Sequence, residues 1–162
     1  MSRRIVPMLL LATVLAGCGG SENEPEAAPA RQEFIAEGDA ICAEGQQEAL
    51  ELRQRAQELE AQRGTVPDEE LLDDAAALWN DQIAVIERFR DRFADLDPPA
   101  GEEERVEEFV ATFDEGSEAA RAVRDAIDDE DPSPQLVQTY AGVVARGNVL
   151  ARAFGFRVCG RP

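Results

Sequence analysis

Small and apolar residues recur every three or four positions along most of this chain, which is the spacing of one face of an α-helix. The first such stretch covers residues 33–62 and ends near Gly64, a residue type that often terminates helices. Charged residues, mainly glutamate and arginine, fill its other faces. The stripe consists of Phe34, Gly38, Ile41, Gly45, Ala49, Leu52, Ala56 and Leu59.

The second stretch is the most apolar outside the N-terminus. Thr65 is expected to cap it, with Pro67 early in the helix. We expect it to stop at Asp97, because two prolines follow. Its stripe contains Leu71, Ala75, Leu78, Gln82, Ile86, Phe89, Phe93 and Leu96, and is widened by Leu72, Trp79 and Ile83.

Two further helical stretches cover residues 101–129 and 133–154. Ser133 is the expected N-cap of the last helix, with Pro134 at its first position and Gly155 at its end. The acidic run 128–131 suits a helix C-terminus badly, so we expect the third helix to fray there. No alternating pattern long enough for a strand occurs. We therefore predict an all-α, antiparallel (up-down-up-down) four-helix bundle over residues 33–162.

The composition agrees with helices. Hydrophobic residues make up 44% of the 162 residues but aromatic ones only 6%, and much of the remainder is alanine. Alanine is the best helix former and a poor strand former. This length suits a single domain with its own core.

The N-terminus has the pattern of an export signal. Arg3 and Arg4 precede an apolar run over residues 5–16. A membrane-spanning helix needs about 20 apolar residues, so this run is too short to span and is typical of a cleaved signal peptide.

The run ends at Leu15-Ala16-Gly17-Cys18, which resembles the lipobox of bacterial lipoprotein signal peptides. The resemblance covers residues 1–18 and implies diacylglycerol on Cys18 and cleavage after Gly17. Residues 1–17 would then be the signal peptide. An ordinary secretory signal with a chance cysteine at the boundary is the alternative. The implied location is the cell membrane, lipid-anchored and facing the extracytoplasmic side.

Residues 18–32 mix glycine, proline and acids without apolar periodicity, so we expect a disordered, flexible linker between the lipid and the helical domain.

Three cysteines leave an even pair once Cys18 is assigned to the lipid. Cys42 and Cys159 can then form a disulfide, which exported proteins permit. In the expected topology the first helix starts where the fourth ends, and the chain from Phe154 to Cys159 is long enough to fold back. Two free buried thiols or an intermolecular bridge remain open as alternatives.

The two ends of the mature chain carry a second resemblance. Phe34-Ile35-Ala36 and Asp39-Ala40-Ile41-Cys42, together with the closing segment Phe154-Gly155-Phe156-Arg157-Val158-Cys159-Gly160, resemble a group of small actinobacterial lipoproteins and secreted helical proteins of unknown function. The resemblance implies a helical domain with one end-to-end disulfide. It brings no catalytic or binding residues.

The negative net charge of the chain argues against some classes of binding partner. Acidic residues number 34 against 16 basic ones, and the net charge is −18. Binding of nucleic acid requires a basic face, so nucleic acid is not expected as a partner. Adsorption to anionic lipid headgroups is also disfavoured. The simplest interpretation of the charge is a solvated surface without a specific ligand.

No catalytic or metal site is predicted. The chain contains no histidine, the usual base of hydrolytic triads and a ligand of bundle di-iron sites. Carboxylate pairs are expected by chance in so acidic a chain. Residues 128–131 could hold calcium weakly, although a solvated charge run explains them better. We expect no enzyme activity, no cofactor and no resident metal.

Two groups of side chains could form a binding site. Arg88, Arg90 and Arg92 alternate with phenylalanines; ion pairs with Glu87, Asp91 and Asp95 explain them, and an anion or partner site is the alternative. Trp79 and Tyr140 could line a crevice, although core packing is commoner.

The favoured hypothesis is a lipid-anchored extracytoplasmic module that acts through protein interaction or as a structural component of the cell envelope. Its envelope protein partner is not identified by the sequence. The alternative is a small-ligand or cation-binding lipoprotein. An exposed apolar patch would favour the first hypothesis, and a concave pocket with converging polar groups the second.

Overall fold

The computed structural model describes residues 24–161 and contains four helices, with no strand in that range. They are α1 (Glu24–Ala61), α2 (Asp68–Ala94), α3 (Glu103–Asp128) and α4 (Pro134–Phe154). The all-α prediction is confirmed, and so is the number of helices in the predicted domain. The predicted signal peptide (1–17) and the predicted lipidation site Cys18 lie outside the described residues.

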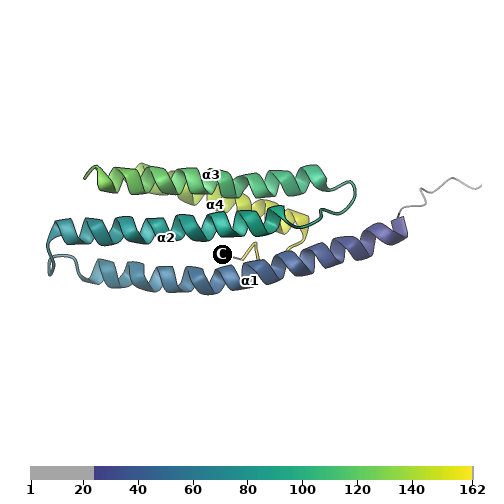
Figure 1. Ribbon diagram of the computed structural model, residues 1–162, viewed down its shortest axis with the longest axis horizontal. Helices are drawn as coiled ribbons and strands as arrows, with labels where there is room; N and C mark the ends of the chain where they lie inside the picture. Colours follow the sequence, from purple (N-terminus) through teal and green to yellow (C-terminus); the bar gives the residue numbers. More distant parts are fainter. Residues whose placement is uncertain (1–23, 162) are drawn as a thin grey trace, which may run out of the picture.

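The four helices lie side by side as an elongated bundle (Figure 1). The α1–α2 and α3–α4 loops lie at one end of the bundle and the α2–α3 loop at the other, so consecutive helices run in opposite directions. The first turns of α1 project beyond the other helices at the end where α4 finishes.

The start of α1 differs from the expectation. The helix begins at Glu24 rather than at Glu33, so residues 24–32, assigned to the flexible linker by their composition, are helical. Pro25 lies in the first turn, where its missing N–H has no helical partner to lose. Glutamate, alanine, glutamine and arginine, which are good helix formers, make up most of the segment.

The other helix ends mostly follow the sequence. Ser133 is the N-cap of α4 with Pro134 behind it, and Gly155 adopts a left-handed conformation (φ 116°) where that helix stops. α3 ends at Asp128, and Glu130 takes a left-handed φ of 56° in the turn that follows. The expected capping role of Thr65 is wrong: Pro67 is the N-cap of α2, and the Thr65 hydroxyl instead donates to the carbonyl of Gln62.

The best-packed part of the core is a phenylalanine cluster at the end where α4 finishes. Phe93 is fully buried, and its ring lies 5.1 Å from that of Phe109 and 5.9 Å from that of Phe156, centroid to centroid. Phe154 and Phe156 stack at 5.1 Å. α1 passes close to this cluster at Gly38. A side chain at that position would overlap the Phe156 ring, so the close approach requires glycine. Glycine in the stripe thus lets aromatic rings lie directly on the α1 backbone.

The bundle is not closed on its fourth side. α2 packs against α1 and α3, and α3 packs against α4, but no Cα atom of α1 comes within 8 Å of one of α4 among the described residues. α1 and α4 meet through side chains such as Phe34 and Phe154, whose rings are 5.3 Å apart, and through the C-terminal tail (residues 155–161).

Candidate functional site

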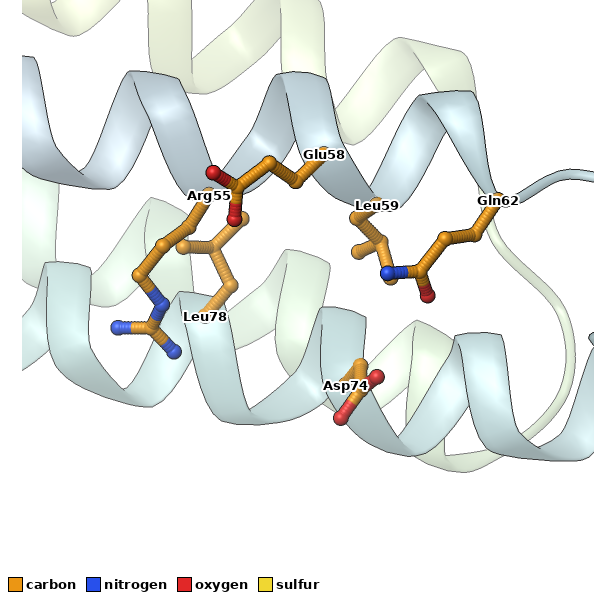
Figure 2. A pocket seen from close by; sticks show the side chains of 6 residues that line it. All are labelled: Arg55, Glu58, Leu59, Gln62, Asp74 and Leu78. Carbon is orange, nitrogen blue, oxygen red and sulfur yellow. The ribbon is translucent and has the colours of Figure 1, made fainter.

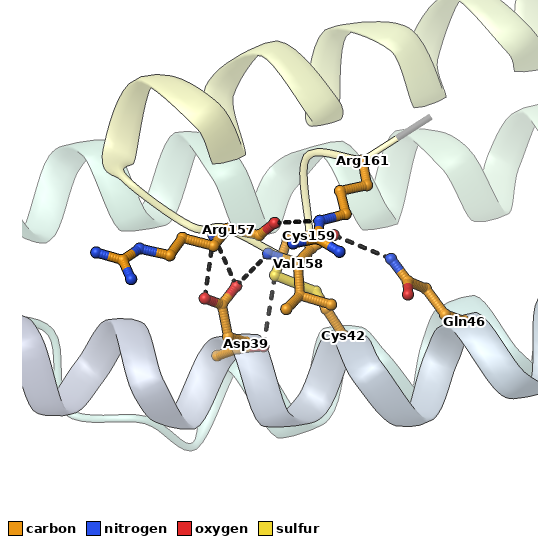
Figure 3. The surroundings of a disulfide bond; sticks show 8 residues. Asp39, Cys42, Gln46, Arg157, Val158, Cys159 and Arg161 are labelled. Carbon is orange, nitrogen blue, oxygen red and sulfur yellow. Dashed lines mark hydrogen bonds between the residues drawn. A yellow bond between two sulfur atoms is a disulfide. The ribbon is translucent and has the colours of Figure 1, made fainter.

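Cys42 and Cys159 form a disulfide (Figure 3). Their Cα atoms are 5.0 Å apart, within the usual range for bridged cysteines. Cys42 lies on α1 and Cys159 in the C-terminal tail, 117 positions later, so the bond joins the two ends of the domain. The predicted pairing is therefore confirmed, and the alternatives of free thiols or an intermolecular bridge do not apply to this structure.

A second set of contacts fixes the tail to α1 (Figure 3). The carboxylate of Asp39 accepts hydrogen bonds from the backbone N–H of Arg157 at 2.9 Å and of Val158 at 2.7 Å. Gln46 donates to the Val158 carbonyl at 3.1 Å. Asp39 thus satisfies backbone donors that no helix or sheet would satisfy. No signal in the sequence pointed to this role of Asp39, which belongs to one of the segments of the second resemblance.

Two arginines close the end of α4. The guanidinium carbons of Arg31 and Arg105 lie 5.0 Å and 5.2 Å from the centre of the Phe154 ring, a cation–π geometry. Both arginines pair with Glu102, and they donate to the carbonyls of Phe154 and Ala153 respectively. Each cation already has a carboxylate and a carbonyl partner, so this cluster is a structural clamp rather than an anion site.

The arginines of α2 also form ion pairs, but two of the three pair with α1 and not with the partners that we expected on their own helix. Arg88 pairs with Glu48 and Arg92 with Glu44, both on α1. The hydrogen bond from Arg92, together with its positive charge, lowers the pKa of Glu44. Arg90 alone keeps an expected partner, lying 3.0 Å from Asp91. Glu87, which we expected to pair with these arginines, instead pairs with Arg121 of α3. These arginines therefore tie α2 to its neighbours, which leaves little for an anion to bind.

A small apolar hollow of about 150 Å³ lies beside the disulfide, between α3, α4 and α1. Tyr140 lines it and also packs edge-on against Trp79, with ring centroids 5.1 Å apart. Burial raises the pKa of Tyr140 to about 12. Pockets for drug-sized ligands are usually about 300–1,000 Å³, so this hollow is too small for most organic ligands.

A larger apolar groove opens farther along α1, which we call the far groove. It consists of two adjoining hollows of about 420 and 290 Å³ that share Ala56, Leu78 and Trp79. Its walls come from the second half of α1, the first half of α2, and Ile127 with Pro132 beyond. Its apolar floor is formed by Leu52, Leu59, Leu72, Ala75, Leu78 and Trp79.

The α1–α2 seam is hollowed on another side as well. A pocket of about 160 Å³ lies where Arg55, Glu58 and Gln62 of α1 face Asp74 of α2, with Leu59 and Leu78 between the helices (Figure 2). Charged and amide groups surround it, and Arg55 is already paired with Asp81. The lining of this pocket is mainly polar, whereas that of the far groove is mainly apolar.

Within residues 24–161, which include the run 128–131, no three histidine, cysteine or carboxylate side chains are grouped as metal ligands. In the same range no helix is both long and apolar enough to cross a membrane.

Most apolar residues of the far groove belong to the predicted stripes, but the groove itself was not predicted. Ala49, Leu52, Ala56 and Leu59 belong to the stripe predicted to face the core, yet none of the four is fully buried. A stripe shows which face is apolar but not whether a partner helix covers it. Comparison of the chain with family models, with curated proteins and with solved structures finds no match.

Proposed function

We propose that this protein is a lipoprotein, anchored through Cys18, that presents its helical domain outside the cytoplasm as a protein-interaction module. The anchor rests on the Leu15-Ala16-Gly17-Cys18 motif. The extracytoplasmic location is supported by the Cys42–Cys159 disulfide, because such bonds persist in oxidising compartments. The interaction role rests on one observation, the uncovered far groove.

The anchor would orient the domain. Residues 19–23 separate Cys18 from the start of α1, and five residues span at most about 18 Å. α1 has 38 residues and is therefore about 57 Å long. The disulfide-bonded end lies toward the start of α1, and the far groove lies along its second half. The groove would thus lie toward the end of the domain opposite the anchor, where an envelope protein can reach it.

A ligand-binding or cation-binding role is less well supported. The hollow beside the disulfide measures about 150 Å³, which is below the usual volume of a ligand pocket, and most of its lining is apolar. No carboxylate cluster suited to a cation is present among the described side chains.

The anchor is tested by expressing the full chain in a bacterium and comparing it with Cys18→Ser. We expect the parent protein to fractionate with membranes and to carry a diacylglycerol in its intact mass, while Cys18→Ser leaves the membrane fraction. Retention of residues 1–17, or identical fractionation of the two proteins, would contradict the anchor.

The interaction role is tested in the same cells with a photo-crosslinking amino acid placed on either side of the groove. Ala56 on the α1 wall and Asp68 on the α2 wall, which are both exposed, are suitable positions, and exposed Ala36 on the first half of α1 serves as the control. A defined adduct at the first two positions and none at Ala36 is expected. No adduct at any of the three would count against an interaction module.

A further inference from the structure

We infer that the end of the domain nearest the lipid anchor binds the surface of an anionic bilayer. The contact is made by four exposed or partly engaged side chains that we call the tail face: Val149 and Arg152 on α4, and Arg157 and Arg161 in the tail. The inference goes beyond the proposed interaction role, and it rests on the proposed anchor, which holds the domain beside a membrane. One lipid group combined with a cluster of basic residues is a common way to strengthen membrane attachment.

The acidic residues of the chain are distributed unevenly. All 34 of them precede Pro132, whereas residues 132–162 contain four arginines and no acid. The net charge of −18 therefore arises from α1, α2, α3 and the segments between them, and not from α4 and the tail. An anionic membrane repels the acidic part of the domain and attracts the region around the arginines. Contact with headgroups, which the net charge disfavours for the whole chain, is thus expected at the tail face.

The arginines of the tail face differ from the others in their partners. In the described part of the chain before residue 150, every arginine except Arg53 pairs with a carboxylate. Arg152, Arg157 and Arg161 pair with no carboxylate among the described residues. Arg152 donates to the carbonyl of Gly160 at 2.6 Å, and Arg161 donates to another carbonyl of the tail at 2.8 Å. A carbonyl carries no net charge, so the three positive charges are not neutralised.

Two acids near the tail face are already engaged. The carboxylate of Asp39 accepts hydrogen bonds from two backbone N–H groups of the tail. Glu102 pairs with both Arg31 and Arg105. These contacts leave the arginines of the tail face to a negatively charged partner outside the described chain.

The tail face is a continuous surface. Val149 and Arg152 are three positions apart on α4, so they are neighbours on the helix surface, and both are exposed. The hydrogen bond from Arg152 to Gly160 places the tail beside them. Val149 is 54% exposed, more than Leu50, Val137 or Val144. Apolar side chains together with arginines are typical of protein surfaces that bind the membrane interface.

The tail face lies at the end of the bundle where α1 starts, since α4 finishes there (Figure 1). Figure 3 shows the Arg157 side chain extended away from Gln46, toward the start of α1. Residues 19–23 span at most about 18 Å, so they keep the start of α1 close to the bilayer. From Glu24 to Gly38, α1 rises by about 21 Å. The inference therefore predicts that the domain leans against the bilayer and does not stand upright on α1.

An acidic protein is another partner that these arginines would attract. The bilayer is favoured because the proposed anchor keeps it next to the tail face, and because uncompensated arginines match the charge of anionic headgroups.

The test places a single tryptophan on the tail face. The lipidated mature protein carrying Trp79→Phe and Val149→Trp is reconstituted in vesicles of equal parts phosphatidylcholine and phosphatidylglycerol, with brominated acyl chains that quench tryptophan emission near the bilayer. Trp79 is the only native tryptophan. The control carries Trp79→Phe and Ala94→Trp, because Ala94 is exposed at the same end of the bundle on α2, and no described Cα atom of α2 lies within 8 Å of one of α4. Circular dichroism checks that both proteins keep their helices.

We expect quenching in the Val149→Trp protein to be at least about twofold stronger than in the Ala94→Trp protein, because only the first position lies on the tail face. The difference should decrease when phosphatidylglycerol is omitted and when salt is added, since both changes weaken the attraction between the arginines and the headgroups.

Two sets of arginine variants, made in the Val149→Trp protein, separate the tail face from charge in general. Replacing the three arginines of the tail face by glutamine should reduce quenching by at least about twofold, and replacing them by lysine should preserve it because the charge is kept. The matched set removes the same charge from exposed positions in the second half of α1 and the turn after it, and should have a smaller effect. It consists of Arg53→Gln, Arg55→Gln and Arg63→Gln.

The inference is wrong if the two tryptophan positions are quenched equally, if neither is quenched, if phosphatidylglycerol makes no difference, or if both arginine sets have the same effect. A photo-crosslinker at Val149 that gives a protein adduct in cells and no lipid adduct would also overturn it, in favour of a protein partner. These results leave the anchor intact, because reconstitution uses protein whose intact mass has shown the diacylglycerol. Absence of that mass would overturn the anchor and this inference together.

Discussion

The two halves of this bundle are built from similar stripes but packed differently. In the disulfide half, which contains α1 up to residue 45, the end of α2, the start of α3, the end of α4 and the tail, phenylalanine rings and glycines interlock. In the groove half, which contains the remaining parts of the helices, α1 contributes no buried residue after Ile41. The same face of α1 is thus buried in the disulfide half and partly exposed in the groove half.

The difference arises from what lies between α1 and α4. In the disulfide half the C-terminal tail fills this space with Phe156, and Asp39 and Cys42 hold it there. In the groove half no segment of the described chain takes the place of the tail. The disulfide half is therefore expected to be the more stable part of the molecule, and the groove half carries the exposed apolar surface. Binding regions are often found in the less stable parts of proteins.

The largest expected effect comes from breaking the disulfide. Cys42→Ser combined with Cys159→Ser should lower the free energy of unfolding by up to about 4–5 kcal/mol, because the bond closes a loop of more than a hundred residues in the unfolded chain. Urea unfolding followed by circular dichroism measures this. Hydrogen exchange tests the comparison: amides of the disulfide half should lose more protection than those of the groove half. Equal losses would mean that the two halves unfold as one unit.

The next prediction compares the stability lost when one side chain in each half is truncated to alanine. Phe93→Ala empties a fully buried site and should lower the free energy of unfolding by about 3–5 kcal/mol. Leu59→Ala, at a half-buried position of the groove, should cost about 1 kcal/mol or less because part of the leucine is already in water. Denaturant midpoints of the two variants give the values. Similar losses would show that the groove half is as well packed as the disulfide half.

The sequence predicted the helices because their determinants are local. Periodicity identified the stripes, Ser133-Pro134 marked the start of α4, and Gly155 marked its end. The Cys42–Cys159 pairing was predictable because few cysteines left few partners. The start of α1 was missed because prolines and glycines near the N-terminus suggested a linker, although residues 24–32 are rich in helix formers.

What the sequence did not predict depends on contacts between distant segments. Nothing local distinguishes Ile41, which is buried, from Leu52, which is not, because both lie on the same stripe. The outcome is decided by the tail, more than a hundred residues later, which covers only the first half of α1. The cross-helix partners of Arg88 and Arg92 were missed for the same reason, since the expectation considered only neighbours on α2.

A third prediction concerns Tyr140, whose ring lies where the two halves meet. Burial raises its pKa from the ordinary value of 10 to about 12, so the folded protein keeps the phenolic proton in a range where the unfolded chain loses it. This contribution to stability is complete below about pH 10 and declines as the pH rises toward 12, by at most about 3 kcal/mol for two pKa units.

The chain suits this measurement because it has one tyrosine, no lysine and no histidine. Tyrosinate absorbance should rise with a midpoint well above pH 10, and Tyr140→Phe should flatten the stability profile between pH 10 and 12. A midpoint at the ordinary value would mean that the hollow lined by Tyr140 is open to water.

The last comparison concerns two glycines, one in each half, whose replacement by alanine is expected to have effects of opposite sign. Gly38→Ala places a methyl group against the Phe156 ring and 3.0 Å from the Phe93 ring, so it should lower the free energy of unfolding by about 1–3 kcal/mol. Gly142→Ala has no atom within 4 Å of the new methyl group and lies exposed within α4, so it should raise stability by about 0.5–1 kcal/mol through helix propensity.

Thermal and urea unfolding of the two alanine variants, side by side, measure this contrast. Because the chemical change is identical, the difference in sign isolates the space around each glycine. If Gly142→Ala were destabilising as well, the groove half would be more tightly packed than its exposed side chains indicate, and the surface proposed for partner binding would be correspondingly smaller. If Gly38→Ala were neutral, the tail would be able to move away from α1, and the disulfide alone would hold it.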